Sequence, residues 1–320
     1  MSKPEQGGAS PPGSGVRIVE VPEDREGQRL DNLLFNLLKG VPKTHVYRLL
    51  RTGQVRVNGK RAKADTRVEG GDKLRIPPVR MADPAEQPRA SERSLQALSA
   101  AIVAEDRNFI ALDKPSGLAS HGGSGISLGA IEQIRQLRPK ESLELVHRLD
   151  RDTSGILLIS RKRSALSAVQ AAIREGRVHK RYLTLLAGKL PKASVKVDAA
   201  LEKSVLRGGE RLVQVSEHGK ASRSTFRLVQ ALRGYSYCEV IIDTGRTHQI
   251  RVHAQHLGLP VAGDDKYGDP EANRKLKELG LKRLFLHAAR LEFDLGELGD
   301  YSFSAPLPRE LAAVLERLGS

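Results

Sequence analysis

The sequence predicts an α+β protein, with a small basic N-terminal domain over residues 16–80. A larger domain over residues 99–320 is built on a mixed, mainly antiparallel β-sheet with flanking helices. Three observations support this. A chain of 320 residues is too long for one ordinary core. Residues 16–80 carry 15 Lys and Arg but only 8 Asp and Glu. From about residue 100, short β-rich runs alternate with helical stretches without a regular βαβ pattern.

Two segments lack the periodicity of folded elements. Residues 1–15 are rich in Gly, Pro and Ser, which predicts a disordered tail. This tail contains no apolar stretch of the kind found in a signal peptide. Residues 81–98 combine Pro, Ala and mixed charge, which predicts a linker between the two domains.

The N-terminal domain is expected to be helix–helix–hairpin–strand. Five leucines spaced for one helical face open it: Leu30, Leu33, Leu34, Leu37 and Leu38. Pro42 can start a second helix, with Val46, Leu49 and Leu50 on its apolar side and Gly53 after its end. Next, Val55 and Val57 alternate before Asn58-Gly59, the favoured type I′ turn pair, which predicts a hairpin. "EGGDKLRIP" supplies a further turn and strand.

The larger domain is expected to contain many short strands. Its β-rich runs cover residues 102–103, 109–112, 156–159, 182–186, 235–242 and 284–286. Helical spacing occurs between them, for example over residues 128–137 and 165–173.

The net charge of +15 favours a polyanionic partner, and nucleic acid fits better than a membrane. No run of 18 apolar residues is present, and the chain has no Trp to anchor a basic amphipathic helix in a bilayer. Lys43, Arg48 and Arg51 project from the second predicted helix, away from its apolar side, and are candidate RNA-binding residues. A single cysteine, Cys238, excludes an intramolecular disulfide and favours a cytoplasmic location.

The segment "LVHRLDRDTSGILLIS" (residues 145–160) crowds charged residues against an apolar run. Arginines beside Asp150 would keep its carboxylate ionised. The cluster is either a turn with solvated charges or a functional site. If it is a site, Arg151 and Asp152 are expected to form only a local pair.

A second polar cluster, "DTGRTHQIRVHAQH" (residues 243–256), follows a predicted strand. Alternation around Arg251 suggests that its side chain points opposite to its neighbours. A metal site of His248, His253 and His256 is disfavoured, because their spacing matches no H-E-x-x-H pattern and no nearby carboxylate is set as a ligand. "DTG" alone does not make an aspartic protease, because arginines flank it. "HRLD" is loosely similar to the H-R-D loop of kinases, but no glycine-rich phosphate loop and no D-F-G accompany it, so a kinase is disfavoured. A clamp for a polyanion or a carboxylate remains.

Two further segments are ambiguous by themselves. "SHGGSG" (residues 120–125) is either a phosphate-cradling loop or a plain surface loop. In "KRYLTLLAG" (residues 180–188), Tyr182 is either a base-stacking residue beside cations or a core tyrosine.

Taken together, "HRLDRDTSG", "KRYLTLLAG", "DTGRTHQIRVH" and "RLFLHA" (residues 283–288) resemble the ordered motifs of the RluA-type pseudouridine synthases. "DKPSGLASHGGSG" fits the early strand and loop of this family. The N-terminal domain resembles the S4 RNA-binding domain, and the resemblance runs from about residue 27 to the C-terminus.

This resemblance implies a role for each matching residue. Asp150 is the essential catalytic residue, and Arg251 pairs with it. Tyr182 stacks on the target base, Arg148 fills the space left by the flipped uridine, and Leu286 lines the uracil pocket. The resemblance further implies a pseudouridine synthase fold for residues 99–320 and isomerisation of uridines in large-subunit (23S) ribosomal RNA. We expect a monomer that needs no metal or cofactor.

Two other functions stay open from the residues alone. A non-catalytic RNA-binding or ribosome-assembly protein would use the basic N-terminal domain equally well, but would not need the set of Asp150, Tyr182 and Arg251. A nucleoside hydrolase would need a second carboxylate. Asp152 is too close to Asp150 in sequence to serve obviously.

Overall fold

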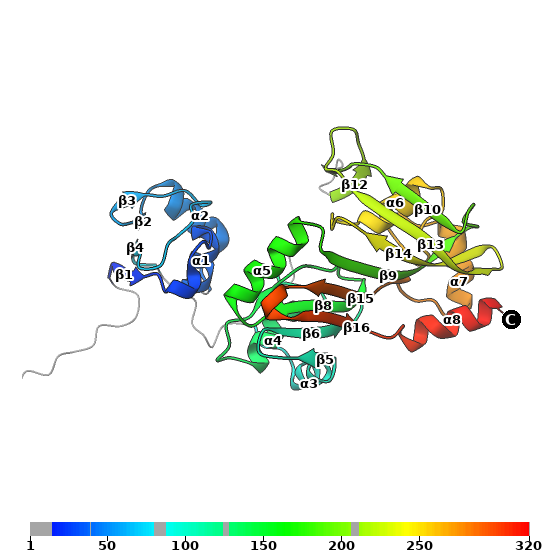
Figure 1. The fold of residues 1–320 in the computed structure, drawn as a ribbon, viewed down its shortest axis with the longest axis horizontal. Coiled ribbons are helices and arrows are strands. Elements are labelled where there is room, and N and C mark those ends of the chain that lie inside the picture. Colours follow the sequence, from blue (N-terminus) through cyan, green and yellow to red (C-terminus); the bar gives the residue numbers. More distant parts are fainter. Residues whose placement is uncertain (1–14, 39, 80–87, 124–127, 206–210, 320) are drawn as a thin grey trace, which may run out of the picture. The chain divides into compact units, whose positions relative to one another are not determined.

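The computed structural model describes residues 15–38, 40–79, 88–123, 128–205 and 211–319 (Figure 1). The chain divides into two compact units, Met1–Pro88 and Arg89–Ser320. The predicted tail over residues 1–15 lies outside the described residues, except for Gly15. Residues 80–87, which include the start of the predicted linker, lie outside them as well. The C-terminal part of the predicted linker, 81–98, is helical in the structure. Ser91 caps this helix, α3 (Glu92–Ala100), by accepting a hydrogen bond from the Ser94 N–H, and Leu98 is buried.

The N-terminal unit has the predicted order of elements, with one strand added in front. It comprises β1 (Arg17–Glu20), the 3₁₀ turn η1 (Glu23–Arg25), α1 (Leu30–Leu37), α2 (Lys43–Arg51), β2 (Arg56–Val57), β3 (Lys60–Arg61) and β4 (Lys73–Ile76). The sheet order is β1-β4-β2-β3. Asn58 and Gly59 both have positive φ, 49° and 77°, which confirms the predicted I′-type turn. The apolar faces of α1 and α2 share one core with β4.

The larger unit is built on a ten-stranded sheet. Its main path is β10-β13-β14-β9-β15-β8-β6-β5, with β16 on β15 and β7 on β8. Every described pair is antiparallel except β15 with β8, so the predicted mixed, mainly antiparallel sheet is confirmed. The strands are β5 (Ile102–Glu105), β6 (Phe109–Lys114), β7 (Glu144–Leu145), β8 (Ser154–Ser160), β9 (Val178–Ala187), β10 (Ser194–Asp198), β13 (Arg223–Leu232), β14 (Tyr235–Ile242), β15 (Leu286–Asp294) and β16 (Asp300–Ser304). A separate pair joins β11 (Leu201–Val205) to β12 (Arg211–Val215).

Helices cover both faces of the central strands (Figure 1). Besides α3, they are α4 (Ala130–Leu137), α5 (Arg163–Arg174), α6 (Gln249–His256), α7 (Pro270–Glu278) and α8 (Arg309–Gly319). On β8, Leu157 and Ile159 belong to the core cluster that contains α4, whereas Ile156 and Leu158 belong to the cluster that contains α5. A strand buried on both faces requires a continuous apolar run, which explains residues 156–159.

Candidate active site

Asp150 lies on the loop between β7 and β8, and a neighbouring segment fixes this loop through its backbone. The Ser120 hydroxyl donates to the Leu149 carbonyl oxygen (2.7 Å) and accepts the Leu149 N–H (2.9 Å). The Gly117 N–H and the Ser116 hydroxyl donate to the carbonyl oxygens of Arg151 and Asp152. The residues on either side of Asp150 are thus tied to residues 116–120, which limits the movement of its carboxylate.

Lys114, at the end of β6, is the centre of this support. Its side chain is fully buried, and its Nζ donates to the carbonyl oxygens of Pro115 (2.9 Å), Leu118 (2.7 Å) and Arg151 (3.0 Å). Burial lowers the pKa of Lys114 to about 7. Three acceptors, however, require the three N–H donors of an ammonium, so these contacts favour the charged form. This cation joins the end of β6 to the loop that carries Asp150.

The parallel pairing of β8 with β15 requires a glycine directly after the loop. Gly155 has φ of 107°, and a Cβ at this position would lie 2.2 Å from the Ala288 carbonyl oxygen. Ala288 is also the partner of Tyr182 on β9. The close approach at Gly155 therefore brings the β8 end of the Asp150 loop toward the strands that carry Tyr182 and Leu286.

Arg148, Asp150, Tyr182 and Leu286 line one small cavity of about 70 Å³. Tyr182 and Leu286 are nearly buried, Asp150 is partly exposed, and Arg148 is exposed. Burial and, secondarily, the negative charge of Asp150 raise the pKa of the Tyr182 phenol well above its ordinary value. Tyr182 is therefore neutral at physiological pH. The residues predicted for the flipped base thus surround the same cavity as the predicted catalytic residue.

Arg251 is on α6 and lies between the carboxylates of Asp150 and Asp264. Its Nε and Nη2 donate to Asp264 Oδ2 (2.7 Å) and Oδ1 (2.8 Å), while Nη1 is 3.5 Å from Asp150 Oδ2. The sequence interpretation was wrong about the local structure, because residues 249–256 are helical rather than alternating. The carboxylate nearest to Arg251 is that of Asp264, and Asp150 is farther away. Burial opposes ionisation of Asp264, but the hydrogen bonds and charge of Arg251 keep the pKa of Asp264 below its ordinary value.

His248, which precedes α6, also faces Asp150. Its backbone has φ of 55°, an uncommon conformation for a residue with a side chain. Its Nε2 lies 3.9 Å from Asp150 Oδ2, and its Nδ1 is 2.8 Å from the Tyr267 hydroxyl. The Tyr267 oxygen already accepts the Val213 N–H, so its own proton is available for Nδ1. This arrangement places the ring proton on Nε2, the nitrogen that faces the Asp150 carboxylate.

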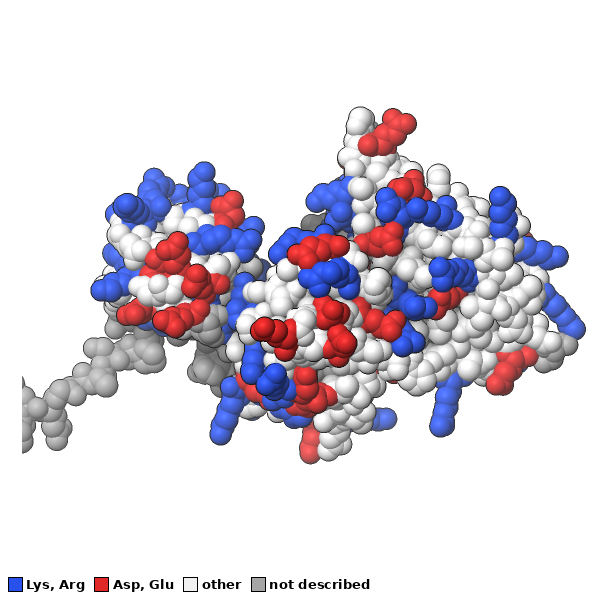
Figure 2. Space-filling view, viewed as in Figure 1, with Lys and Arg blue, Asp and Glu red and all other residues white. Residues whose placement is uncertain are grey.

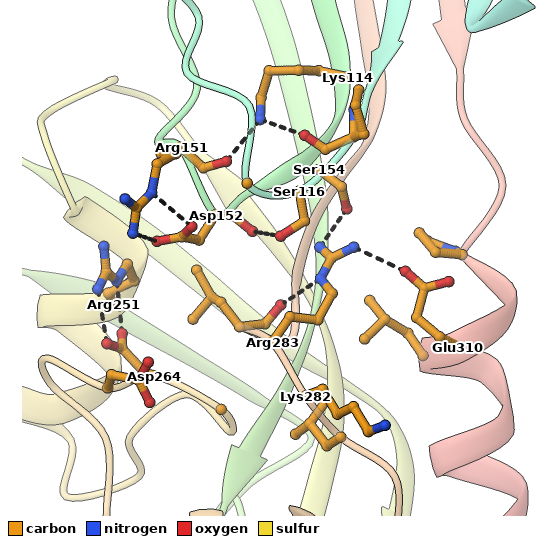
Figure 3. Close-up of a pocket in the computed structure, with 18 of the residues that line it drawn as sticks. Lys114, Ser116, Arg151, Asp152, Ser154, Arg251, Asp264, Lys282, Arg283 and Glu310 are labelled. Atoms are coloured by element: carbon orange, nitrogen blue, oxygen red, sulfur yellow. Dashed lines mark hydrogen bonds and ion pairs between the residues drawn. The ribbon is translucent and has the colours of Figure 1, made fainter. Parts of the chain in front are cut away.

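A larger cavity of about 990 Å³ lies beside this site, and both His248 and Arg251 line it (Figure 3). Arg151 pairs with Asp152 here at 3.0 Å, which confirms the local pair expected from the sequence. Arg283 donates to the Ser154 hydroxyl (2.6 Å) and to Glu310 of α8 (3.2 Å). Ion pairs thus neutralise much of the wall of this cavity.

The three predicted RNA-binding residues of α2 belong to the N-terminal unit. Lys43, Arg48 and Arg51 are exposed, as their spacing predicts. Lys43 Nζ lies 5.3 Å from the centre of the Phe35 ring. Figure 2 shows Lys and Arg side chains gathered over the part of this unit that carries α2, β2 and β3.

Other histidines of the second polar cluster have different partners. His253 is fully buried, and its two ring nitrogens contact the Ser224 hydroxyl and the Ala199 carbonyl oxygen, both at 2.9 Å. Among the described residues, no group of three or more His, Cys, Asp or Glu side chains is placed to hold a metal ion. In the glycine-rich segment 120–125, Ser120 supports Leu149, whereas residues 124–127 are outside the described part of the chain.

Sequence reasoning missed Lys114, Asp264 and Tyr267. Asp264 and Tyr267 lie in "GDDKYGD", which has no apolar period and looks like a surface turn. The only signal was the density of Asp and Gly in a region without periodicity. Lys114 stood within a recognised segment, but nothing in the sequence indicates that a lysine at the end of a strand is fully buried.

Comparison with known proteins agrees with this geometry. Residues 108–256 match the family model described as RNA pseudouridylate synthase, and residues 28–74 match the S4 domain. "Ribosomal large subunit pseudouridine synthase C" of Salmonella typhi is 48% identical over 310 residues, covering 95% of this chain and 97% of the relative. The protein of the same name from Haemophilus influenzae is 46% identical over 308 residues, covering 95% and 96%.

A solved structure shares the fold over most of the chain. "Human RNA Pseudouridylate Synthase Domain Containing 1" is 26% identical with a TM-score of 0.58, covering 71% of this chain and 90% of the human chain. No helix in the described ranges is long and apolar enough to cross a membrane. Because its sequence relatives, its fold and the clustering of its motif residues agree, the chain belongs to the RNA pseudouridylate synthase family and carries an N-terminal S4 domain.

Proposed function

We propose that this protein isomerises specific uridines of large-subunit (23S) ribosomal RNA to pseudouridine, with Asp150 as its catalytic residue. One observation carries the proposal: the cavity formed by Tyr182, Leu286 and Arg148 contains a single carboxylate, that of Asp150, among the described residues that line it. Arg251 Nη1 and His248 Nε2 both lie nearest to its Oδ2.

The number of carboxylates distinguishes an isomerase from a hydrolase. Pseudouridine formation breaks the N1–C1′ bond, turns the uracil ring and joins C5 to C1′; the proton lost from C5 is balanced by the proton gained at N1. One carboxylate suffices, either by attacking C1′ or by taking a proton from C2′. A glycoside hydrolase commonly uses two carboxyl groups and a water. The lining of this cavity favours the isomerase.

Holding the detached uracil requires a closed and largely apolar pocket. Tyr182 and Leu286 supply a stacking surface and an aliphatic wall. Extracting the uridine from a helix costs a few kcal/mol. Arg148 is exposed at the rim, with Nη1 3.4 Å from His121 Nε2, and its insertion into the vacated space would offset part of this cost.

Two features support ribosomal RNA as the partner. Two relatives at 46–48% identity are named as ribosomal large subunit enzymes, and the chain carries an S4 domain and a net charge of +15. We infer that it acts in the cytoplasm, as its single cysteine favours, and as a monomer, because the proposed site needs no residue from a second chain. We propose that this chemistry needs no cofactor, because each of its steps can be assigned to the Asp150 carboxylate or to the uracil itself.

The test is to map pseudouridines in total RNA from cells that lack the gene, and then to complement them with the wild type, Asp150→Asn or Asp152→Asn. Asp152 is a matched control, because it is exposed and paired with Arg151. The wild type and Asp152→Asn should restore the same sites in 23S rRNA, and Asp150→Asn should restore none. Restoration by Asp150→Asn, or changes confined to other RNAs, would contradict the proposal.

A further inference from the structure

The N-terminal unit exposes an aromatic side chain on the helix that carries its candidate RNA-binding residues. Tyr47 of α2 is 45% exposed. The other large apolar side chains that the described part of the chain leaves exposed are aliphatic: Val16, Ile18, Val103 and Val229. Aromatic rings in basic surroundings are common platforms for unpaired bases.

Contacts on its own unit fix the Tyr47 ring. Phe35 packs against it edge to face, with ring centres 5.6 Å apart. The Tyr47 hydroxyl donates to Asp31 Oδ2 at 3.4 Å, and Arg29 holds the same carboxylate through two hydrogen bonds of 3.1 and 2.7 Å. A ring held in this way loses little conformational freedom when a ligand stacks on it.

Tyr47 is also part of the wall of a cavity of about 540 Å³. Leu50, Ala62 and Ala64 form apolar parts of the wall, and its remaining residues are the cations Arg51, Arg61 and Lys63. The volume lies within the range of about 300–1,000 Å³ that is usual for small-molecule sites.

The three cations are available to an anion. Arg61 Nη2 donates to the Arg51 carbonyl oxygen at 2.9 Å, which keeps these two residues together. Within the described ranges, no carboxylate forms an ion pair with Arg51, Arg61 or Lys63. An aromatic platform with unpaired cations on one rim has the chemistry of a nucleotide site.

We propose that this cavity binds one unpaired nucleotide of the substrate RNA. The base stacks on Tyr47, and the phosphates that flank this nucleotide lie against Arg51, Arg61 and Lys63. The inference rests on the proposed function, because it assumes that RNA is the partner. It deepens that function by giving the N-terminal unit a site for a single-stranded position. Lys and Arg on α2 would otherwise contact the phosphate backbone without regard to base pairing.

Fluorescence offers a direct test, because the chain contains no Trp. Tyr47→Trp places a single reporter in the cavity of the full-length protein. Saturation with an in vitro transcript of 23S rRNA should quench its emission strongly, as expected for a stacked base. The matched control Ile18→Trp, at a 72% exposed position on β1, should be quenched much less. Equal emission of Tyr47→Trp with and without bound RNA would overturn the proposal.

Affinity provides a second measurement. Tyr47→Ala should bind the transcript about 5- to 150-fold more weakly, whereas Tyr47→Phe should bind within about twofold of the wild type. Ile18→Ala should have no effect. Thermal unfolding of each variant shows whether the fold persists. Wild-type affinity in a folded Tyr47→Ala variant would also overturn the proposal.

The results separate this inference from the proposed function. A wild type that binds the transcript but forms no pseudouridine in it contradicts the function, whereas quenching of Tyr47→Trp still supports the site. If pseudouridine forms normally but RNA does not change the emission of Tyr47→Trp, only the proposed nucleotide site is contradicted. Absence of RNA binding by the wild type contradicts both.

Discussion

Arg251 and Asp264 form a buried, two-point ion pair, and the third guanidinium nitrogen of Arg251 lies 3.5 Å from Asp150. Arg251 is 9% exposed and Asp264 is fully buried at the side chain. Two hydrogen bonds to one carboxylate fix the plane of the guanidinium. Asp264 thereby sets the direction from which Arg251 meets the Asp150 carboxylate.

Asp264→Asn should lower kcat by at least about tenfold and change KM much less, because the amide NH2 group replaces one of the two oxygens that accept from Arg251. Single-turnover kinetics on an rRNA fragment would measure this. The neighbouring Asp265, which is exposed, gives the control Asp265→Asn. An unchanged kcat in Asp264→Asn would show that Arg251 orients itself without this partner.

Tyr267→Phe should lower kcat by about threefold to tenfold, because His248 loses the donor that fixes its tautomer. The loss of one acceptor for the Val213 N–H should also cost about 1 kcal/mol of unfolding free energy. Kinetics well below the melting temperature separate these effects. Tyr237→Phe, which alters a half-buried tyrosine packed on Phe285, is the control. Equal rates for both variants would argue against a role for the His248 tautomer.

Lys114→Met should decrease the free energy of unfolding by at least about 2 kcal/mol, because three buried carbonyl oxygens lose their donor. The remaining folded protein should have a lower kcat, since the Asp150 loop loses its contact at Arg151. Urea unfolding and activity per folded molecule measure the two effects. The control Lys140→Met, at an exposed lysine, should change neither the free energy of unfolding nor kcat. Full activity in folded Lys114→Met would mean that the other backbone contacts suffice.

Acid should destabilise the fold through its buried histidines. Burial lowers the pKa of His253 and of His287, both fully buried, below the value of 6.5 expected in the unfolded chain. The unfolded state therefore binds more protons, and the unfolding free energy falls as pH decreases below about 6.5. Each residue contributes up to about 1.4 kcal/mol at pH 5.5.

Urea unfolding between pH 7.5 and 5.5 measures this dependence. His253→Gln should flatten it by up to the contribution of one residue. His218→Gln, which changes an exposed histidine, is the matched control. A free energy of unfolding that rises toward pH 5.5 would contradict the sign of the effect.

Replacing Lys43, Arg48 and Arg51 together by Gln should weaken RNA binding and reduce the salt slope of log K by about 2 to 3. Replacing Arg17, Lys73 and Arg75 of β1 and β4 removes the same charge from exposed positions elsewhere in the unit. This control should have the smaller effect. Equal slopes would show that only total charge matters. Titrations at four salt concentrations decide between these outcomes.

Local patterns predicted the N-terminal unit well, because its leucine spacing and its Asn-Gly turn depend on neighbours in the sequence. They failed at Arg251, where three alternating residues looked extended but form part of a helix that contacts β12 and β13. The motifs indicated Asp150 and Tyr182 through a family resemblance. Asp264 and Tyr267 could not be predicted, because their roles arise only when a turn 13 to 16 residues after Arg251 folds back over it.

The loop around Asp150 is held chiefly through the backbone groups of Leu149, Arg151 and Asp152. Such contacts are indifferent to the side chains at these positions. The side chains of exposed Arg148 and Arg151 can therefore change without displacing the Asp150 carboxylate. If the proposed function holds, the position of the reacting carboxylate is independent of the side chains that RNA would meet at positions 148 and 151.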